Sequence, residues 1–168
     1  GNPQTQQSAT QNKADLDKQI AHAKSIGVPS ALLTPIINQE NTLANTHEPV
    51  SLFSSQPTTT YYANLSQNYE TLAIQVKGLE DQTTQQYGRQ ATQSVKDFQT
   101  ILATRQNQGY VEAKTFSAQF SQLQSQMNSA NDPGQYLVIN QAALQGTKAL
   151  TLLGTTNDQF ASLRSQIS

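Results

Sequence analysis

The fold is decided by residues 58–108, TTTYYANLSQNYETLAIQVKGLEDQTTQQYGRQATQSVKDFQTILATRQNQ, a stretch that contains no proline. Its apolar residues recur at spacings of three and four, the period of one face of an α-helix. These positions are Leu65, Tyr69, Leu72, Val76 and Leu79, followed by Tyr87, Ala91, Val95, Phe98 and Leu102. The pattern predicts one long helix, about 75 Å in length at ~1.5 Å per residue, and Gly88 is where a bend is easiest.

Glycine and proline divide the rest of the chain into shorter helices. Gly27 and Gly109 are predicted to end helices, Ser30 to cap the second helix, and Asp132 with Pro133 to start the last one. The last helix carries another apolar series at spacings of four and three, which we expect to belong to the core. Its positions are Ala142, Gly146, Ala149, Leu153, Thr156, Phe160, Leu163 and Ile167.

The two halves of the chain also resemble each other. At an offset of 82 residues, Ala9-Thr10-Gln11 aligns with Ala91-Thr92-Gln93, and Gly27 aligns with Gly109. The apolar series of the third helix in each half aligns when Tyr62 is placed over Tyr136. Chance similarity between Gln-rich helices is the alternative explanation.

We therefore predict an all-α fold of two tandem three-helix bundle units, an approximate internal duplication that shares the long central helix. The first unit is expected to span residues 9–88 and the second residues 89–168. Residues 1–8 are expected to form a polar N-terminal tether.

The polar surface is unusual because it is almost uncharged. The chain of 168 residues has 26 Gln but only 10 Lys and Arg and 11 Asp and Glu, with a net charge of -1. Nucleic acids and anionic lipids attract clustered basic residues, and here these are scattered singly, so we expect neither as a partner. No apolar run approaches the ~18 residues of a membrane span. The absence of cysteine excludes disulfides.

No pattern of catalytic or metal-binding residues stands out. There are two histidines, His22 and His47, and the helical neighbours of His22 at four residues' distance, Lys18 and Ile26, cannot bind a metal with it. No glycine-rich phosphate loop and no Gly-x-Ser-x-Gly sequence occur. We therefore expect a chain that is not an enzyme and that has no cofactor.

Tyr61, Tyr62 and Tyr69 form the one aromatic cluster that could contact a ligand, because tyrosine rings stack on sugars. The alternative is that they form the wall of one end of the first bundle, with their hydroxyls reaching water. The apolar segment 50–53, Val-Ser-Leu-Phe, lies between prolines and is expected to fold back over that bundle.

Segment 27–62, with Gly27-Val28-Pro29 and Ser51-Leu52-Phe53, resembles Gln-rich helical regions that precede cell-wall or peptidase domains in secreted bacterial proteins. The resemblance is to a class and to no specific family, and no catalytic motif accompanies it. The polar start of the chain, residues 1–8 without an initiator Met, is similar to the tether that follows a removed signal peptide or lipid anchor. An arbitrary boundary within a cytoplasmic protein is the alternative.

Together these features predict a non-catalytic, extracytoplasmic helical spacer or protein-interaction module of a larger bacterial envelope protein. Its partners would be other domains of the same polypeptide or another protein. The alternative function is a helical domain that binds cell-wall glycan or peptide through the region of Tyr61 and Tyr62.

Overall fold

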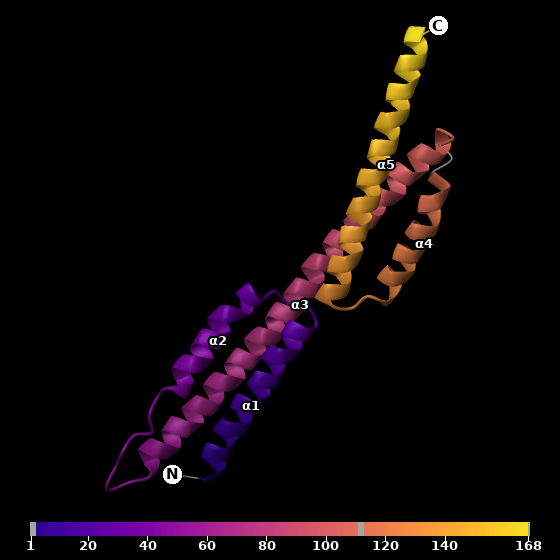
Figure 1. Ribbon diagram of the computed structural model, residues 1–168. Helices are drawn as coiled ribbons and strands as arrows, with labels where there is room; N and C mark the ends of the chain where they lie inside the picture. The colour runs from indigo at the N-terminus through magenta and orange to yellow at the C-terminus, as the bar shows by residue number, and fades with distance from the viewer. Residues whose placement is uncertain (1–2, 111–112, 168) are drawn as a thin grey trace. The chain divides into compact units, whose positions relative to one another are not determined.

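The computed structural model describes residues 3–110 and 113–167 and is all-α (Figure 1). Within these ranges no strand occurs and the helices are α1 (Pro3–Ser25), α2 (Ser30–Ala44), α3 (Gln56–Asn107), α4 (Ala113–Ser129) and α5 (Pro133–Ile167). The predicted long central helix is confirmed as α3, which continues through Gly78 and Gly88 without interruption. Because α1 begins at Pro3, residues 3–8 of the expected tether are helical.

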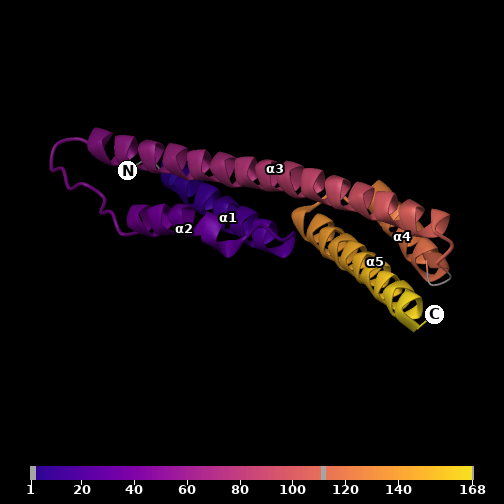
Figure 2. The ribbon, with the colours of Figure 1, turned by 90° about the horizontal axis from the view of Figure 1, so that it is seen from above.

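The chain divides into two compact units, Gly1–Thr83 and Thr84–Ser168. In the first unit, α1 and α2 lie alongside the N-terminal part of α3 (Figures 1 and 2). Each of the three helices contributes its apolar face to one core, as the helical periodicity requires. The buried residues of this core are Leu16, Ile20, Ala23, Val28, Leu33, Ile36, Tyr69, Leu72 and Val76.

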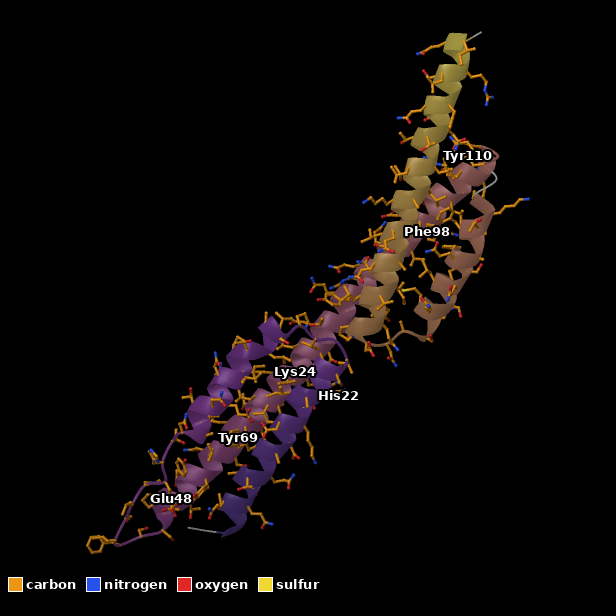
Figure 3. All side chains as sticks on the ribbon, in the orientation of Figure 1. His22, Lys24, Glu48, Tyr69, Phe98 and Tyr110 are labelled. Carbon is orange, nitrogen blue, oxygen red and sulfur yellow. The ribbon has the colours of Figure 1, made fainter. Side chains whose placement is uncertain are left out.

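The second unit packs α4 and α5 against the C-terminal part of α3 around Phe98 (Figure 3). The Phe98 ring meets the rings of Phe116 and Phe120 edge to face, with centroids 6.4 Å and 5.9 Å apart. Gly146 makes room for it, because a Cβ atom at that position would lie 2.8 Å from the Phe98 ring. The buried residues of this core are Ala91, Val95, Phe98, Leu102, Ala113, Leu123, Ile139, Ala143 and Leu150.

Gly27 and Gly109 end α1 and α3, as predicted. Both have positive φ angles, 98° and 78°, which a residue with a side chain rarely adopts. The residue after each glycine donates its N–H back into the helix, from Val28 to the Ala23 carbonyl at 2.9 Å and from Tyr110 to the Arg105 carbonyl at 3.2 Å. This is the Schellman closing turn in both cases.

The predictions for the helix starts have mixed outcomes. The Asp132 carboxylate accepts the backbone N–H of Gln135 at 2.9 Å, so the predicted cap of α5 is confirmed. The predicted Ser30 cap is wrong, since Pro29 occupies the N-cap position of α2 and no side chain caps that helix. Ser30 already has helical geometry as the first residue of α2, and a capping residue must precede that point.

The expectation that the whole apolar series of α5 is buried is also wrong. Gly154 is the last buried residue of α5, and Phe160, Leu163 and Ile167 are exposed. Gly154 packs on Arg105, close to the end of α3 at Asn107, so the following turns of α5 have passed the end of that neighbouring helix. A seam needs a facing helix, and in the described part of this unit none reaches these turns.

Candidate functional site

The connection between α2 and α3 exposes apolar side chains. Val50, Leu52 and Phe53 are 92%, 86% and 96% exposed, so the expectation that they fold back over the bundle is wrong. The Ser51 hydroxyl accepts the backbone N–H groups of Phe53 and Ser54 at 3.5 Å and 3.3 Å. This local turn satisfies the backbone without packing, and it leaves the neighbouring apolar side chains in solvent.

Tyr61 and Tyr62 hold the base of this connection. The Tyr61 hydroxyl is hydrogen-bonded to the Thr46 hydroxyl at 2.7 Å, and the Tyr62 hydroxyl donates to the Glu48 carboxylate at 2.7 Å. Figure 3 shows Glu48 at this base. The hydrogen bond to Glu48 raises the pKa of Tyr62. The two rings are edge to face, with centroids 5.0 Å apart. Both phenols therefore position the segment that precedes α3.

A further hydrogen bond closes the same segment. The Thr58 hydroxyl, in the first turn of α3, donates to the Pro49 carbonyl at 3.3 Å. Glu48 and Pro49, which lie directly before the apolar residues, are thus both tied to α3. We call residues 50–53 the tip and the bonded residues Thr46, Glu48, Pro49, Thr58, Tyr61 and Tyr62 the base of this loop.

Tyr69, the third tyrosine of the predicted cluster, lies elsewhere. It is 2% exposed, within the core of the first unit, and burial raises the pKa of its phenol. Figure 3 shows it among the helices, away from Glu48 at the base of the loop. The structure thus brings Tyr61 and Tyr62 together at the loop and places Tyr69 in the core of the unit.

A charged cluster between α1 and α2 was not foreseen from the sequence. The Lys13 ammonium lies 3.2 Å from the Asp17 carboxylate and 3.8 Å from that of Glu40. Burial, together with the neighbouring Asp17, raises the pKa of Glu40 to about 7, while interaction with Glu40 and Lys13 lowers the pKa of Asp17. The sequence signal was weak, because Glu40 is separated from the other two by a turn and most of a helix.

This cluster has the composition of an acid–base pair but not the accessibility of one. Near neutral pH, Asp17 is ionised, while Glu40, whose pKa is about 7, gains or loses its proton. Glu40 is only 6% exposed, however, and lies against the packing of α1 on α2. Its position suits a contact that stabilises or titrates the unit rather than a group that meets a substrate.

A groove between α2 and α3 in the first unit has the features of a site for an uncharged ligand. Its volume is about 360 Å³, at the low end of the range for small-molecule pockets. It is lined by Leu43 and Leu72 and by side chains with uncharged hydrogen-bonding groups. These are Asn38, Gln39, Thr42, Asn68, Thr71 and Gln75.

Among the residues that the structure describes, no three His, Cys, Asp or Glu side chains gather closely enough to hold a metal ion. None of the helices in the described ranges has the length and apolar character needed to cross a membrane. No known family, curated protein or solved structure matches this chain.

Proposed function

We propose that the chain is a non-catalytic, extracytoplasmic helical module of a larger bacterial envelope protein, and that it acts through protein contacts. The observation that carries the proposal is the loop between α2 and α3. Its tip presents Val50, Leu52 and Phe53 to solvent, and its base is fixed by three hydrogen bonds to α3 and its tyrosines.

The energetics of the tip support a binding role. Burying one Leu or Phe side chain in a partner gains about 1.5–3 kcal/mol, so the tip can supply several kcal/mol of binding free energy. Association also loses conformational entropy, and the hydrogen bonds at the base reduce that loss by fixing the loop beforehand. The expected partner surface is an apolar depression, either on another domain of the same polypeptide or on another protein.

We further propose that the two units arose by duplication of one three-helix bundle. At the offset of 82, Ala9, Leu16 and Ile20 correspond to Ala91, Phe98 and Leu102, and all six are buried. At the offset of 74, four consecutive buried positions of α3 correspond to four of α5. These pairs are Tyr69 and Ala143, Leu72 and Gly146, Val76 and Leu150, and Glu80 and Gly154.

Hydrogen bonds repeat with the same offsets. The Gln11 side chain donates to Asp15 at 2.9 Å, and Gln93 donates to Asp97 at 2.8 Å. Between helices, Asn12 donates to the Ser66 hydroxyl, and the corresponding pair, Ser94 and Asn140, is also hydrogen-bonded with the residue types exchanged. Both bonds hold the first helix of a unit to its third, so the correspondence extends to how the helices are joined.

Side-chain volume is exchanged in the same way. Leu16 and Leu72 in the first unit correspond to Phe98 and Gly146 in the second, where the ring fills the space that a side chain at 146 would need. Ala23 and Glu80 correspond to Arg105 and Gly154, and the Arg105 side chain lies over Gly154. In each exchange a larger side chain at one position is matched by a smaller residue at the position that it contacts, as a packed core requires. These paired exchanges support a common packing arrangement in the two units. They therefore support a repeated spacer unit.

The exchange of side-chain volume can be tested by placing the leucine pair of the first unit at the corresponding positions of the second unit. Gly146→Leu alone should destabilise the protein by about 1–3 kcal/mol, because it overpacks the Phe98 ring. Adding Phe98→Leu should restore most of that loss in urea denaturation. A double variant that is no more stable than Gly146→Leu would contradict the proposed correspondence of these positions.

The binding proposal can be tested with a fluorescent tip. The chain has no cysteine, so Phe53→Cys labelled with an environment-sensitive dye introduces a single reporter. Its emission should shift to the blue when protein extracted from bacterial envelopes is added, and purified peptidoglycan should leave it unchanged. Ile74→Cys with the same dye, at an exposed position of α3, is the matched control and should not shift. No shift of the dye at 53, or an equal shift at both positions, would contradict contact through the tip.

Binding of cell-wall glycan or peptide is the second candidate, favoured by the amide-lined groove between α2 and α3. If this candidate is right, the chain should sediment with purified peptidoglycan. The double variant Gln39→Ala, Asn68→Ala should abolish the sedimentation, whereas Leu52→Ser should not. Tyr61→Ala with Tyr62→Ala separates the two candidates further. These changes free the base of the loop, so they weaken contact through the tip and leave a ligand in the groove bound.

A further inference from the structure

Helix α5 has a second apolar face that its own unit covers only in part, at Ala142. The face that packs into the core runs from Ile139 to Gly154. About 110° around the helix, at 100° per residue, a second line of residues recurs at spacings of three and four. Its exposed members are Val138, Leu152, Thr156, Phe160, Leu163 and Ile167, with Val138 62%, Phe160 61% and Ile167 86% exposed.

Small and uncharged residues complete this line toward the start of α5: Gly134, Ala142, Gln145 and Ala149. We call the whole line, from Gly134 to Ile167, the outer face of α5. The charged residues of α5 are Lys148, Asp158 and Arg164, and each lies about 70° or more from the centre of this face. The outer face is therefore apolar or uncharged along its entire length, as surfaces that pack on another helix are.

The outer faces of two copies of α5 are complementary when the two helices run antiparallel. The first half of the face carries mostly small or polar residues and its second half mostly large ones, so in an antiparallel pair most large residues meet a small or polar one, and Leu163 meets Val138. The pairs are Gly134 with Ile167, Val138 with Leu163, Ala142 with Phe160, Gln145 with Thr156, and Ala149 with Leu152. The polar residues meet each other, and the two-fold axis passes between residues 150 and 151, with Ala142 and Phe160 offset by one residue.

We propose that α5 pairs antiparallel with α5 of a second copy of the chain, through the outer face. Such a pair is isologous, since the same surface serves both copies, and it closes as a dimer. A parallel pair in register would instead place Gly134 on Gly134 and Ile167 on Ile167. That arrangement leaves a gap at one end and crowding at the other.

A groove at the small end of the outer face receives the large end of the second copy. It lies between α4 and α5, has a volume of about 380 Å³, and is lined by Gln126, Ala130, Gly134 and Val138 among others. In the antiparallel pair, Ile167 and Leu163 of the second copy lie over Gly134 and Val138. Their exposed side chains thereby enter a space that the first copy leaves unfilled.

The size of the contact sets its strength. From Gly134 to Ile167 the helix is about 50 Å long, and a strip ~10 Å wide along it covers about 500 Å² per copy. Two copies then bury about 1,000 Å², the lower limit for a specific interface. We therefore expect a dimer that forms and dissociates with concentration rather than a permanent one.

Light scattering coupled to gel filtration, over a hundredfold range of concentration, tests the pairing. The mass should rise from the 18.3 kDa of the chain toward twice that value. Phe160→Lys places a charge on the outer face at an exposed position and should keep the mass at 18.3 kDa. Leu144→Lys changes an exposed leucine of the same helix off this face, and it should dimerise as the wild type does. Circular dichroism confirms that both variants keep their helix content.

A wild type that stays at the mass of one chain throughout would overturn the proposal. Equal loss of dimer in Phe160→Lys and Leu144→Lys would also overturn it, because the contact would then lie on another surface or on none in particular.

The orientation has its own test, which the absence of native cysteine makes clean. Val138→Cys mixed with Leu163→Cys should give a disulfide between the two variants on oxidation. Leu163→Cys alone should not form one, because in the antiparallel pair the two copies of residue 163 are about 38 Å apart along the axis. A disulfide in Leu163→Cys alone, and none in the mixture, would replace the antiparallel pair with a parallel one.

Discussion

The two units build cores of different chemistry on helices that end in the same way. The first unit buries two carboxyl side chains, Glu40 and Glu80, alongside its apolar residues. In the described part of the second unit no charged side chain is buried, and Phe98 packs between two other phenylalanines over Gly146. A chain with few large apolar residues thus adds buried carboxyl groups to one apolar core and a cluster of phenylalanine rings to the other.

This difference has consequences for stability. The carboxyls of the first core need partners, and Gln19 donates to Glu80 at 2.6 Å while Lys13 lies beside Glu40. The contacts of Glu40, whose pKa is raised, depend on protonation, whereas the packing of aromatic rings does not. The first unit should therefore respond to pH and the second to changes of volume.

The largest effect is expected where the aromatic core loses its central ring. Phe98→Ala should lower the free energy of unfolding by about 3–5 kcal/mol, because it leaves a cavity between Phe116, Phe120 and Gly146. Urea denaturation measures the loss, and hydrogen exchange should rise in α4 and α5 more than in α1 and α2. A loss below about 1 kcal/mol would show that Phe98 is not the centre of this core.

The pH dependence of the free energy of unfolding distinguishes the first core from the second, because it comes from the buried carboxyl of Glu40. The pKa of Glu40 is raised from 4.5 to about 7 in the folded chain, so between these values the folded state holds more proton than the unfolded state. Stability from this group is therefore complete below pH 4.5 and is lost as pH rises through about 7, with a slope of at most about 1.4 kcal/mol per unit. Asp17, whose pKa is lowered, acts in the opposite direction at lower pH.

The measurement is the free energy of unfolding between pH 5 and about 7.5, with hydrogen exchange in α1 and α2 as the local readout. Glu40→Gln should remove the slope, since the amide cannot titrate. The control Glu70→Gln changes an exposed carboxyl of α3 and should leave the slope in place. A slope that persists in Glu40→Gln would assign it to another group.

Much of the fold could be predicted from the sequence because helical periodicity and glycine position are local signals. The long helix needed only the apolar series around Leu72 and Phe98, and the ends of α1 and α3 needed only Gly27 and Gly109. The spacing within α5 could not show which face of the helix meets the core. That depends on how α5 is turned toward α3 as well as on where α3 ends, and so Phe160 was assigned to a core that it does not enter.

The candidate site was less accessible to sequence reasoning. Tyr61 and Tyr62 were identified as a pair, but their role depends on Thr46 and Glu48, which reach them only through the path of the loop. The exposure of Phe53 contradicts the ordinary preference of apolar side chains for burial. The outer face of α5 is visible in the sequence only once the structure has shown which face is already covered.

The helix ends, where the two units agree, provide the next test. Gly27→Ala and Gly109→Ala should each cost about 1–2 kcal/mol, because alanine at positive φ is strained. For Gly109 the cost comes from the backbone alone, since an added Cβ would have no atom within 4 Å. Thermal or urea denaturation of the two variants should give similar losses. A large difference between them would mean that the two closing turns are not equivalent in energy.

The smallest effect is expected at the helix starts, where the units differ again. Asp132→Ala removes the carboxylate that accepts the Gln135 N–H, and it should cost about 1 kcal/mol. Ser30→Ala should cost almost nothing, because α2 has no side-chain cap and Ser30 lies inside the helix, where alanine is favoured. Asp132→Asn is the matched control, since its side-chain oxygen can still accept the bond, and it should retain most of the stability. Urea denaturation of the three variants in parallel gives the comparison. Equal losses for Asp132→Ala and Ser30→Ala would contradict the cap at Asp132, since the two positions would then contribute alike despite their different hydrogen bonding.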